Sequence, residues 1–250
     1  MALKISIITA VYNNRTTIED AILSVASQTY QPIEYIVIDG NSNDGTKAIL
    51  DKYRNKISIL VSEPDTGIYN ALNKGLKLAT GDVIGLLHSD DIFASNDVVE
   101  RIINTFETEH PDGVYGDLQY VAKDNTENVF RYWQSAVFYP KMLRRGWMPP
   151  HPTLFLSKDI ITKTGNYNER YRIAADYDFM LRTLSQPNAR FEYIQKTITK
   201  MRTGGASNRS IKNIIFKMWE DYLILRRNKI GGMVALLYKN LSKLHQFINK

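Results

Sequence analysis

The sequence predicts an α/β protein with a mainly parallel sheet flanked by helices. Within the first 90 residues, short runs rich in Ile and Val alternate with segments whose apolar residues recur at helical spacing. Each apolar run ends in a loop rich in Asp, Asn or Gly, as strands of such sheets commonly do. The expected strands lie at about residues 4–9, 35–38, 57–61 and 83–87. Because a helical segment separates each pair, these strands should run parallel.

Three helices should connect these strands. The first is expected from about Thr17, where Thr16 and Glu19 have the spacing of a capping box. The second should begin near Thr46, and Gly81 should stop the third.

The ligand crevice of a doubly wound sheet lies beyond the carboxyl ends of the strands, where the winding reverses. If the strand order is 3-2-1-4, this point lies between the first and fourth strands. The loops at residues 9–14 and 88–91 should then face each other across the crevice.

Composition excludes several classes of protein. The 250 residues contain no cysteine, which excludes disulfides and thiolate metal sites. The start of the chain lacks the apolar core of a signal peptide, and no apolar run of roughly 18 residues occurs elsewhere. We therefore expect a cytoplasmic protein, with peripheral attachment to the inner face of the cell membrane as the alternative.

Positive charge is concentrated at the end of the chain. The net charge is +6, and residues 201–250 hold ten Lys or Arg against two acids, which leaves about −2 for the first 200 residues. From Ser210 onward, basic and apolar residues follow helical patterns that are broken at Gly231-Gly232. Such helices either lie on an anionic bilayer or pack their apolar stripe on the domain. No recognised nucleic-acid motif accompanies the charge, so we expect no nucleic-acid partner.

Two aspartates, Asp90 and Asp91, directly follow the fourth expected strand. Neighbouring carboxylates repel each other, which favours a cation close to them. The loop after the first strand has no glycine with which its backbone could wrap a diphosphate, so a hard cation held by carboxylates is an alternative way to neutralise one. A helix cap is the competing interpretation, but Asp97 or Ser95 already suits the helix expected at 98–106.

Five motifs occur in an order shared with one known family. They are TAVYN at residues 9–13, VIDGNSNDGT at 37–46, EPDTGIYNALNKG at 63–75, HSDD at 88–91 and ADYDFMLR at 175–182. Over about residues 4–205 the chain resembles the inverting family 2 glycosyltransferases, whose GT-A fold is a Rossmann-like, mixed but mainly parallel sheet flanked by helices. HSDD is similar to the family's DxD metal motif, and ADYDFMLR is similar to its base motif.

The resemblance implies a nucleotide-sugar site along the strand ends. Asp39 would hydrogen-bond the nucleotide base, with Thr9 and Tyr12 lining the same pocket; alternatively, Asp39 only accepts from turn amides. Asp91 would bind Mg²⁺ or Mn²⁺ against the diphosphate, and Asp90 would contact the ribose or a metal-bound water. The full set expected at the nucleotide is Thr9, Ala10, Tyr12, Asn13, Asp39, Asn70, Lys74, Ser89 and Asp90.

Inverting transfer needs a base that takes the proton of the acceptor hydroxyl. The resemblance points to Asp176, with Asp178 as the alternative; two positions apart on a helix, they point about 200° away from each other and cannot share the role. A helix cap is the structural alternative for Asp176. The chain departs from the family at His88, which replaces the first aspartate of DxD, and at Ala175, which replaces a glutamate.

Four further residues are expected near the diphosphate or the acceptor. His151, between two prolines, sits in a rigid turn that could aim it at a phosphate. Arg172 and Arg202 could hold the diphosphate, and Trp147 could stack on an acceptor sugar. The alternatives are an incidental loop histidine, solvated arginines and a partly buried tryptophan.

The expected organisation is a GT-A catalytic domain at residues 1–208, followed by a basic amphipathic helical extension at 209–250. Residues 1–110 would bind the nucleotide sugar, and residues 111–208 would bind the acceptor. The βα alternation of the first part is lost after about residue 110, where aromatic, Gly-rich and Pro-rich segments follow.

The function expected is metal-dependent, inverting transfer of a sugar, most simply from a UDP-sugar. The acceptor would be a hydroxyl of a saccharide or lipid-linked saccharide in surface polysaccharide synthesis. A sugar nucleotidyltransferase is one rival, but it would be expected to have a Gly-rich, Arg-containing loop after the first strand, which is absent. A catalytically silent protein that binds nucleotide or membrane is the other, and the presence of Asp39, Asp91 and Asp176 argues against it.

Overall fold

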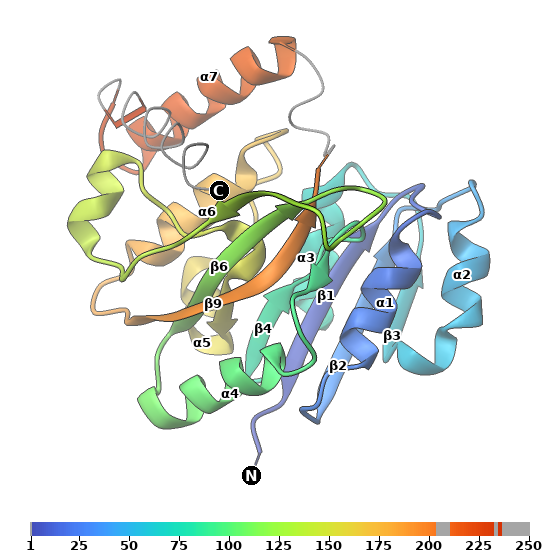
Figure 1. The fold of residues 1–250 in the computed structure, drawn as a ribbon. Coiled ribbons are helices and arrows are strands. Elements are labelled where there is room, and N and C mark those ends of the chain that lie inside the picture. Colours follow the sequence, from blue (N-terminus) through green and yellow to red (C-terminus); the bar gives the residue numbers. More distant parts are fainter. Residues whose placement is uncertain (1, 204–210, 233–234, 237–250) are drawn as a thin grey trace.

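A nine-stranded mixed sheet lies at the centre of the protein (Figure 1). The computed structural model describes residues 2–203, 211–232 and 235–236. In this part of the chain the strand order is β3-β2-β1-β4-β8-β6-β9-β5, and β7 pairs with β6. None of the helices described is long and apolar enough to cross a membrane.

The first half of the chain forms the parallel part of the sheet. Its strands are β1 (Ile5–Val11), β2 (Ile33–Asp39), β3 (Ile59–Ser62) and β4 (Val83–Leu86). They are connected by α1 (Ile18–Ala26), α2 (Thr46–Lys52) with a 3-10 turn η1 (Arg54–Lys56), and α3 (Ile68–Leu78). The pairs β1–β2, β1–β4 and β2–β3 are all parallel. The expected strand order 3-2-1-4 is therefore confirmed.

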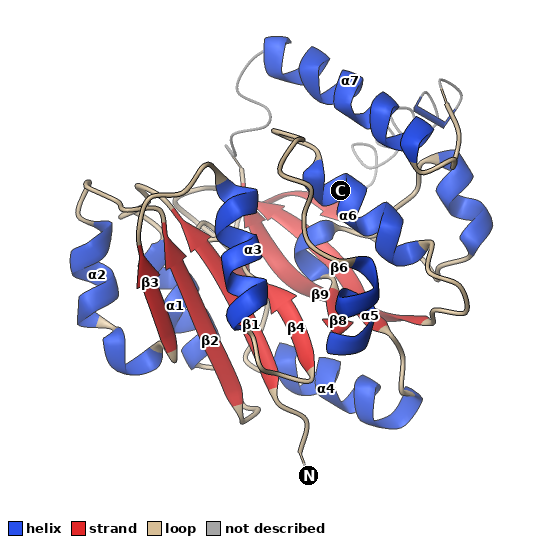
Figure 2. Cartoon of the chain, turned by 180° about the vertical axis from the view of Figure 1, so that it is seen from behind, coloured by secondary structure: helices blue, strands red, loops and turns tan. Residues whose placement is uncertain are grey.

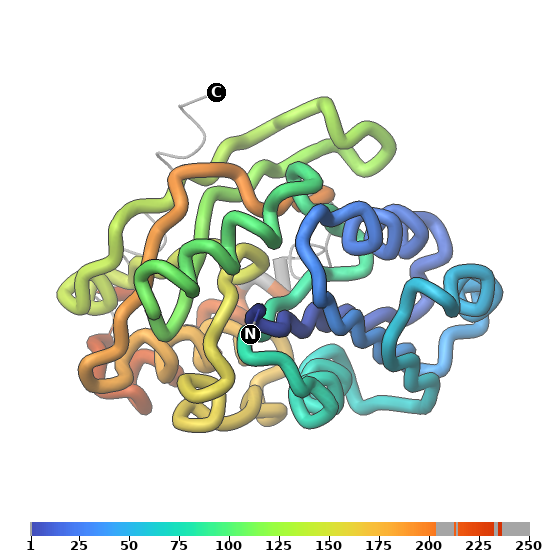
Figure 3. Tube along the Cα trace, turned by 90° about the horizontal axis from the view of Figure 1, so that it is seen from below, coloured from blue at the N-terminus to red at the C-terminus, as the bar shows by residue number. Residues whose placement is uncertain are grey.

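The second half adds strands that run in both directions. They are β5 (Ile92–Phe93), β6 (Gly113–Val121), β7 (Val129–Trp133), β8 (Phe155–Ser157) and β9 (Phe191–Arg202). The helical elements are α4 (Val98–Glu109), η2 (Pro140–Arg145), η3 (His151–Thr153), α5 (Lys158–Thr164), α6 (Ala175–Leu184) and α7 (Ile211–Arg227). β8 is antiparallel to both β4 and β6, whereas β6 is parallel to β9. Seen from below, the first half, blue to cyan, lies beside the second half, green to orange (Figure 3).

Alternate residues of the parallel strands enter two separate cores, because successive side chains of a strand point to opposite faces. Along β1, Ile5, Ile7 and Val11 pack on one face with α1 and α4, and Ile8 and Ala10 pack on the other face with α3 and α6. Figures 1 and 2, taken from opposite sides, show α1 and α4 over one face and α3 and α6 over the other. The sheet edge between these two layers is where the loops after β1, β2 and β4 meet.

The start of α1 differs from the expected capping box of Thr16 and Glu19. Thr17 occupies the N-cap position, and its hydroxyl lies 2.9 Å from the Asn14 side chain and 3.0 Å from the carbonyl oxygen of Ser89. Glu19 accepts a hydrogen bond from a lysine of α2 instead of capping the helix. The capping prediction was wrong because the hydroxyl of Thr16 faces the side chain of Asn14, at 3.4 Å, and Glu19 pairs with α2.

Three other helix ends also differ from expectation. Asp97 is the N-cap residue of α4 by position, but its carboxylate accepts from the hydroxyl of Ser95 and caps no helix amide. α3 ends before Gly81, whose N–H donates to the hydroxyl of Ser6 at 2.9 Å. α7 ends before Gly231. Gly81 is needed for close approach to β1, since a Cβ there would lie 2.7 Å from the backbone nitrogen of Ser6.

Gly85 of β4 lies directly against the ring of Phe155 on β8. A Cβ built on Gly85 would overlap that ring, whereas one on Gly232 meets no described atom within 4 Å. We expect Gly85→Ala to lower the free energy of unfolding by about 1–3 kcal/mol through overpacking. Gly232→Ala is the matched control and should leave stability unchanged. Urea unfolding measures both variants, and equal midpoints would contradict the contact between β4 and β8.

Candidate active site

The loops after β1 and β2 pack closely at one end of the sheet. The N–H of Asn13 donates to the hydroxyl of Ser42 at 2.8 Å, and the Asn13 side chain accepts from the N–H of Asn43 at 2.9 Å. Tyr12, which is 63% exposed, stands beside Gly40, where a Cβ would come within 3.2 Å of its ring. The carboxylate of Asp65 lies still closer to Gly40, since the same Cβ would come within 2.5 Å of it. The exposed ring of Tyr12 therefore provides the surface on which a planar group can stack.

Asp39 and Thr9 lie beneath this surface. The buried carboxylate of Asp39 accepts from the N–H of Ser42 at 3.2 Å and from the hydroxyl of Ser62 at 2.6 Å. Buried Thr9 donates to a backbone carbonyl just after β4 at 2.7 Å, and Ala10 is buried in the core. The contacts of Asp39 match the structural alternative of a turn anchor. Because a carboxylate has about four lone-pair sites, a nucleotide base would share this group with the turn.

Asn70 and Lys74 of α3 are turned toward neighbouring loops. The Asn70 amide donates to Glu169 at 3.1 Å. The Lys74 ammonium group pairs with Glu63 at 2.7 Å and donates to the carbonyl of Pro64 at 3.0 Å. Any contact of these two residues with a nucleotide would compete with these partners.

The loops after β1 and β4 face each other, as the strand order requires. The side-chain amide of Asn14 donates to the hydroxyl of Ser89 at 3.0 Å, and the hydroxyl of Thr17 lies 3.0 Å from the Ser89 carbonyl oxygen. Ser89 and the half-buried Asp90 therefore lie where the winding of the sheet reverses, beyond the ends of β1 and β4.

Asp91 is buried at the end of the same turn. One carboxylate oxygen accepts the N–H of Arg202 at 3.1 Å, and the other has no hydrogen-bond partner in the described chain. Burial raises the pKa of Asp91 well above its usual range, and the charge of Asp90 adds to the rise. An unpartnered, buried carboxylate oxygen fits a hard cation, which would keep the group ionised. No cluster of three acids or histidines occurs among the described residues, so the other ligands would come from the diphosphate and water.

All three guanidinium nitrogens of Arg202 have protein partners. They donate to the carbonyls of Asp90 at 2.9 Å and Lys123 at 3.0 Å, and to the carboxylate of Asp20 at 2.5 Å. The side chain is buried. Arg202 thus connects the turn that contains Asp91 with α1 and with the loop after β6. These contacts do not support the expected contact between Arg202 and a diphosphate.

Asp176 is half-buried in the first turn of α6. The hydroxyl of Tyr69, from α3, lies 3.3 Å from one of its oxygens and donates to the carbonyl of Ile173 at 2.6 Å. Burial, together with the charge of Asp176, raises the pKa of Tyr69, so its hydroxyl stays protonated and can donate. Asp178, in contrast, is buried and paired with Arg182 at 2.8 Å. Of the two candidate bases, Asp176 is the one open to solvent.

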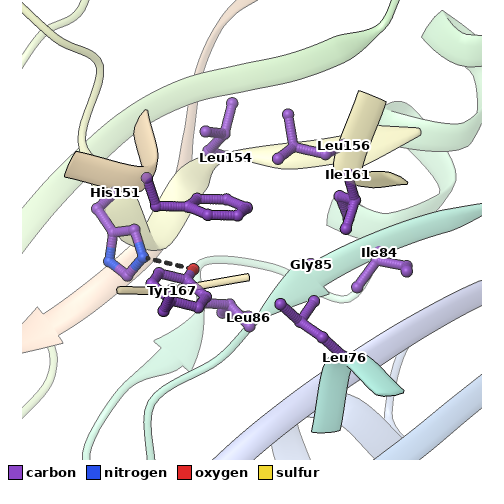
Figure 4. A pocket seen from close by; sticks show the side chains of 10 residues that line it. Leu76, Ile84, Gly85, Leu86, His151, Leu154, Leu156, Ile161 and Tyr167 are labelled. Carbon is purple, nitrogen blue, oxygen red and sulfur yellow. Dashed lines mark hydrogen bonds between the residues drawn. The ribbon is translucent and has the colours of Figure 1, made fainter. Parts of the chain in front are cut away.

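His151 of η3 lies close to the turn after β4 and to α6. Its ring centroid is 5.6 Å from that of His88, and its Nε2 is 3.3 Å from the hydroxyl of Tyr167 (Figure 4). Burial lowers the pKa of His151 to about 4, against the opposing effect of Asp176. The imidazole is therefore neutral near pH 7, and it can offer a phosphate a hydrogen bond but no charge.

A small apolar hollow adjoins His151 (Figure 4). Its lining consists of Leu76, Ile84, Gly85, Leu86, His151, Leu154, Leu156, Ile161, Tyr167 and Phe179. The space open to a water-sized molecule is about 20 Å³, which is room for roughly one water. A sugar would therefore not fit in this hollow.

Trp147 and Arg172 belong to the second half of the chain. Trp147 is half-buried, stacks on Phe138 with ring centroids 5.8 Å apart and meets Tyr115 edge-on at 6.1 Å. The side chain of Arg172 is exposed, and its backbone N–H donates to Glu220 at 2.6 Å. The partial burial foreseen as the alternative for Trp147 is thus observed.

Two residues beside the candidate base were missed by the sequence analysis. Tyr69 lies inside the third motif, but its spacing gives no sign of a contact with Asp176, 107 positions later. Glu220 of α7 accepts from the N–H groups of residues 172–174 at 2.6, 2.9 and 2.9 Å. Glu220 and its neighbour are the only acids in the last fifty residues, and this isolation was a usable signal.

Fold and site together define a GT-A glycosyltransferase. A parallel half carries carboxylates at its strand ends, and a mixed half places a second acid, Asp176, at the start of a helix. A family model described as "Glycosyl transferase family 2" matches residues 6–163. The chain belongs to this family.

Several curated relatives are glycosyltransferases. An uncharacterised glycosyltransferase of Mycobacterium tuberculosis is 33% identical over 180 residues, which are 71% of this chain and 68% of the relative. A PGL/p-HBAD biosynthesis glycosyltransferase of Mycobacterium bovis is 30% identical over 208 residues, covering 81% of this chain and 78% of the relative.

Solved structures with the same fold are more distant in sequence. Staphylococcus aureus TarS aligns with a TM-score of 0.69 at 20% identity, over 89% of this chain and 39% of TarS. A shorter form of TarS was solved with UDP-GlcNAc and has a TM-score of 0.67 at 18% identity, over 90% of this chain and 65% of that form. The mannosyltransferase PcManGT of Pyrobaculum calidifontis, solved with GDP-Man and Mn²⁺, has a TM-score of 0.64 at 14% identity, over 100% of this chain and 76% of PcManGT. At these identities the likeness shows the fold alone.

Proposed function

We propose that the protein is a metal-dependent, inverting glycosyltransferase that uses a UDP-sugar. The acceptor is a hydroxyl of a saccharide or lipid-linked saccharide in surface polysaccharide synthesis in the cytoplasm. The observation that carries the proposal is the contrast between two acids of the site. Asp91 is buried with one unpartnered oxygen, which suits a cation, and Asp176 is partly open to solvent beside the hydroxyl of Tyr69, which suits a base.

The choice of donor rests on the solved structures of the fold. TarS was solved with UDP and with UDP-GlcNAc, which supports a uridine nucleotide and a hexosamine or hexose. PcManGT was solved with GDP-Man, so a guanosine nucleotide is the first competitor to exclude. In this chain the exposed ring of Tyr12 supplies a stacking surface for the base.

The reaction proposed is a single displacement at the anomeric carbon. The acceptor oxygen forms the new bond to that carbon, and the bond from the carbon to the diphosphate oxygen breaks with its electron pair. The acceptor proton passes to the carboxylate of Asp176, which Tyr69 holds from one side. His151, neutral because burial lowers its pKa, can donate a hydrogen bond to a phosphate of the donor.

A divalent cation fits the unpartnered oxygen of Asp91. When bound there, Mg²⁺ or Mn²⁺ would neutralise the negative charge of the departing diphosphate. Arg202 donates its N–H to the other oxygen of Asp91 and its guanidinium to the carbonyl of Asp90, and so fixes the orientation of this carboxylate.

Titration calorimetry with UDP, GDP and dTDP, each with and without Mn²⁺, tests the donor and the cation together. We expect UDP to bind most tightly and to need Mn²⁺. The affinity for UDP should fall at least about tenfold in Asp91→Asn, because loss even of a residue that only supports a metal ligand costs about that much. Asp159→Asn, an exposed acid of α5, is the matched control and should bind as the wild type does.

Nucleotide binding that needs neither Mn²⁺ nor Asp91 would contradict the metal role. Product analysis then separates the enzyme classes. A glycosyltransferase releases a nucleoside diphosphate from its donor, whereas a sugar nucleotidyltransferase releases pyrophosphate.

A further inference from the structure

Helix α7 has two faces of opposite character. One face packs on the rest of the protein through Glu220, Asp221, Ile224 and Leu225, which are all buried. The other face exposes five large apolar side chains, namely Ile215, Phe216, Met218, Trp219 and Leu223. Ile215, Trp219 and Leu223 recur every four residues and therefore form one stripe along the helix. Figures 1 and 2 show α7 at the periphery of the molecule from both sides.

The charge of this outer face is positive. Residues 201–250 contain only two acids, Glu220 and Asp221, and both are buried on the inner face. At the end of α7 the side chains of Arg226, Arg227 and Lys229 are exposed.

The turn η2 extends this basic surface. Its exposed cations are Lys141, Arg144 and Arg145. η2 adjoins the segment that follows α7, since a Cβ built on Gly231, four residues after the end of the helix, would lie 3.9 Å from the carbonyl oxygen of Arg144. Six exposed cations therefore lie in η2 and at or just after the end of α7.

We propose that the outer face of α7 docks on the surface of an anionic lipid bilayer. An apolar stripe beside cations is the pattern of helices that lie in the headgroup region, where apolar side chains insert and cations face anionic lipids. Trp219, 57% exposed with its ring 6.1 Å from that of Tyr222, supplies the aromatic pair that such interfaces favour. A second copy of the chain suits the face less well, because a symmetric contact would bring the same cations together.

Docking through α7 would place the bilayer close to the proposed base. Glu220, on the inner face of the same helix, accepts from the backbone of residues 172–174, directly before α6 and Asp176. An α-helix with its side chains is about 10–12 Å across. A bilayer about one helix diameter from this loop suits a lipid-linked acceptor. Only this statement about the acceptor rests on the proposed function.

Vesicle sedimentation of the full chain tests the docking. The probes are phosphatidylcholine vesicles and vesicles in which about a third of the lipid is phosphatidylglycerol, at low and high salt. We expect binding at least about tenfold stronger to the anionic vesicles, weakened by salt. The double variant Ile215→Gln/Trp219→Gln should lose at least about tenfold in affinity. The matched control is Val129→Gln/Phe130→Gln, which removes two exposed apolar side chains of β7 and should bind as the wild type does.

Three results would overturn the proposal. They are no binding of the wild type to anionic vesicles, equal loss in both double variants, and a dimer in sedimentation velocity that the Ile215/Trp219 variant abolishes while vesicle binding persists. Circular dichroism and nucleotide binding show that each variant is folded. Because vesicle binding needs no turnover, its failure is distinguishable from a failure of the proposed glycosyl transfer.

Discussion

Asp176→Asn is expected to lower kcat by about 10²–10⁴-fold, with nucleotide affinity unchanged, because the amide cannot take the proton of the acceptor hydroxyl. The side chain keeps its shape, so the contact with Tyr69 and the start of α6 should survive. Single-turnover rates with saturating donor and acceptor measure the chemical step, and titration with UDP measures donor binding.

Asp178→Asn is the matched control for this prediction. Asp178 is buried, pairs with Arg182 at 2.8 Å and lies 3.3 Å from the side-chain amide of Asn228. Removing one charge of a buried pair should lower stability while the rate per folded molecule stays close to that of the wild type. A large loss of rate in Asp178→Asn with little change in Asp176→Asn would reverse the assignment of the base.

Glu220→Ala is expected to lower both stability and rate. The buried carboxylate accepts from three backbone N–H groups of residues 172–174, which the substitution leaves without a partner. We expect the free energy of unfolding to fall by at least about 1–3 kcal/mol, since the N–H of Ala174 is buried and a buried donor left unsatisfied costs about that much, whereas the other two hydrogen bonds are only partly buried. The loop before α6 should also loosen, so kcat should fall more than nucleotide affinity does.

Two further variants separate positioning from packing. Glu220→Gln keeps a carbonyl oxygen toward the same amides and should recover part of the rate. Ile224→Val, on the same buried face of α7, should cost about 0.5–1.5 kcal/mol of stability and leave kcat unchanged. A loss of kcat in Ile224→Val as large as in Glu220→Ala would show that α7 affects the site through packing alone. Denaturant unfolding and single-turnover rates provide both readouts.

The parallel half of the sheet was predictable because each strand–helix–strand unit is continuous in the sequence. The runs that form β1 to β4 follow one another with a single helix between them, so hydrophobic periodicity and the handedness of βαβ units suffice. The second half offers no such signal. β8 is only three residues long, and β6 pairs with β9, about 80 positions later in the chain, with shifts in register. Such pairing depends on tertiary contacts that periodicity does not encode.

The candidate site, like the fold, was predictable only in part. The positions of Ser89, Asp90 and Asp91 at the crevice follow from strand order, and this part of the prediction is geometric. The partners of each side chain do not follow from strand order. Arg202 was expected at a diphosphate because arginines commonly bind one, yet it contacts Asp20, 182 positions earlier in the chain.

Glu220 connects α7 to the loop that precedes the proposed base, Asp176. The same helix carries an exposed apolar face on one side and holds the loop before Asp176 on the other. Thermodynamic linkage is reciprocal, so whatever tightens that loop must also favour the position of α7, by the same factor. A substrate that orders the loop would thus strengthen the hold of the helix on its surroundings. In the docked state that we propose, ordering of this loop by substrate would strengthen binding of α7 to the bilayer, and release of product would weaken it.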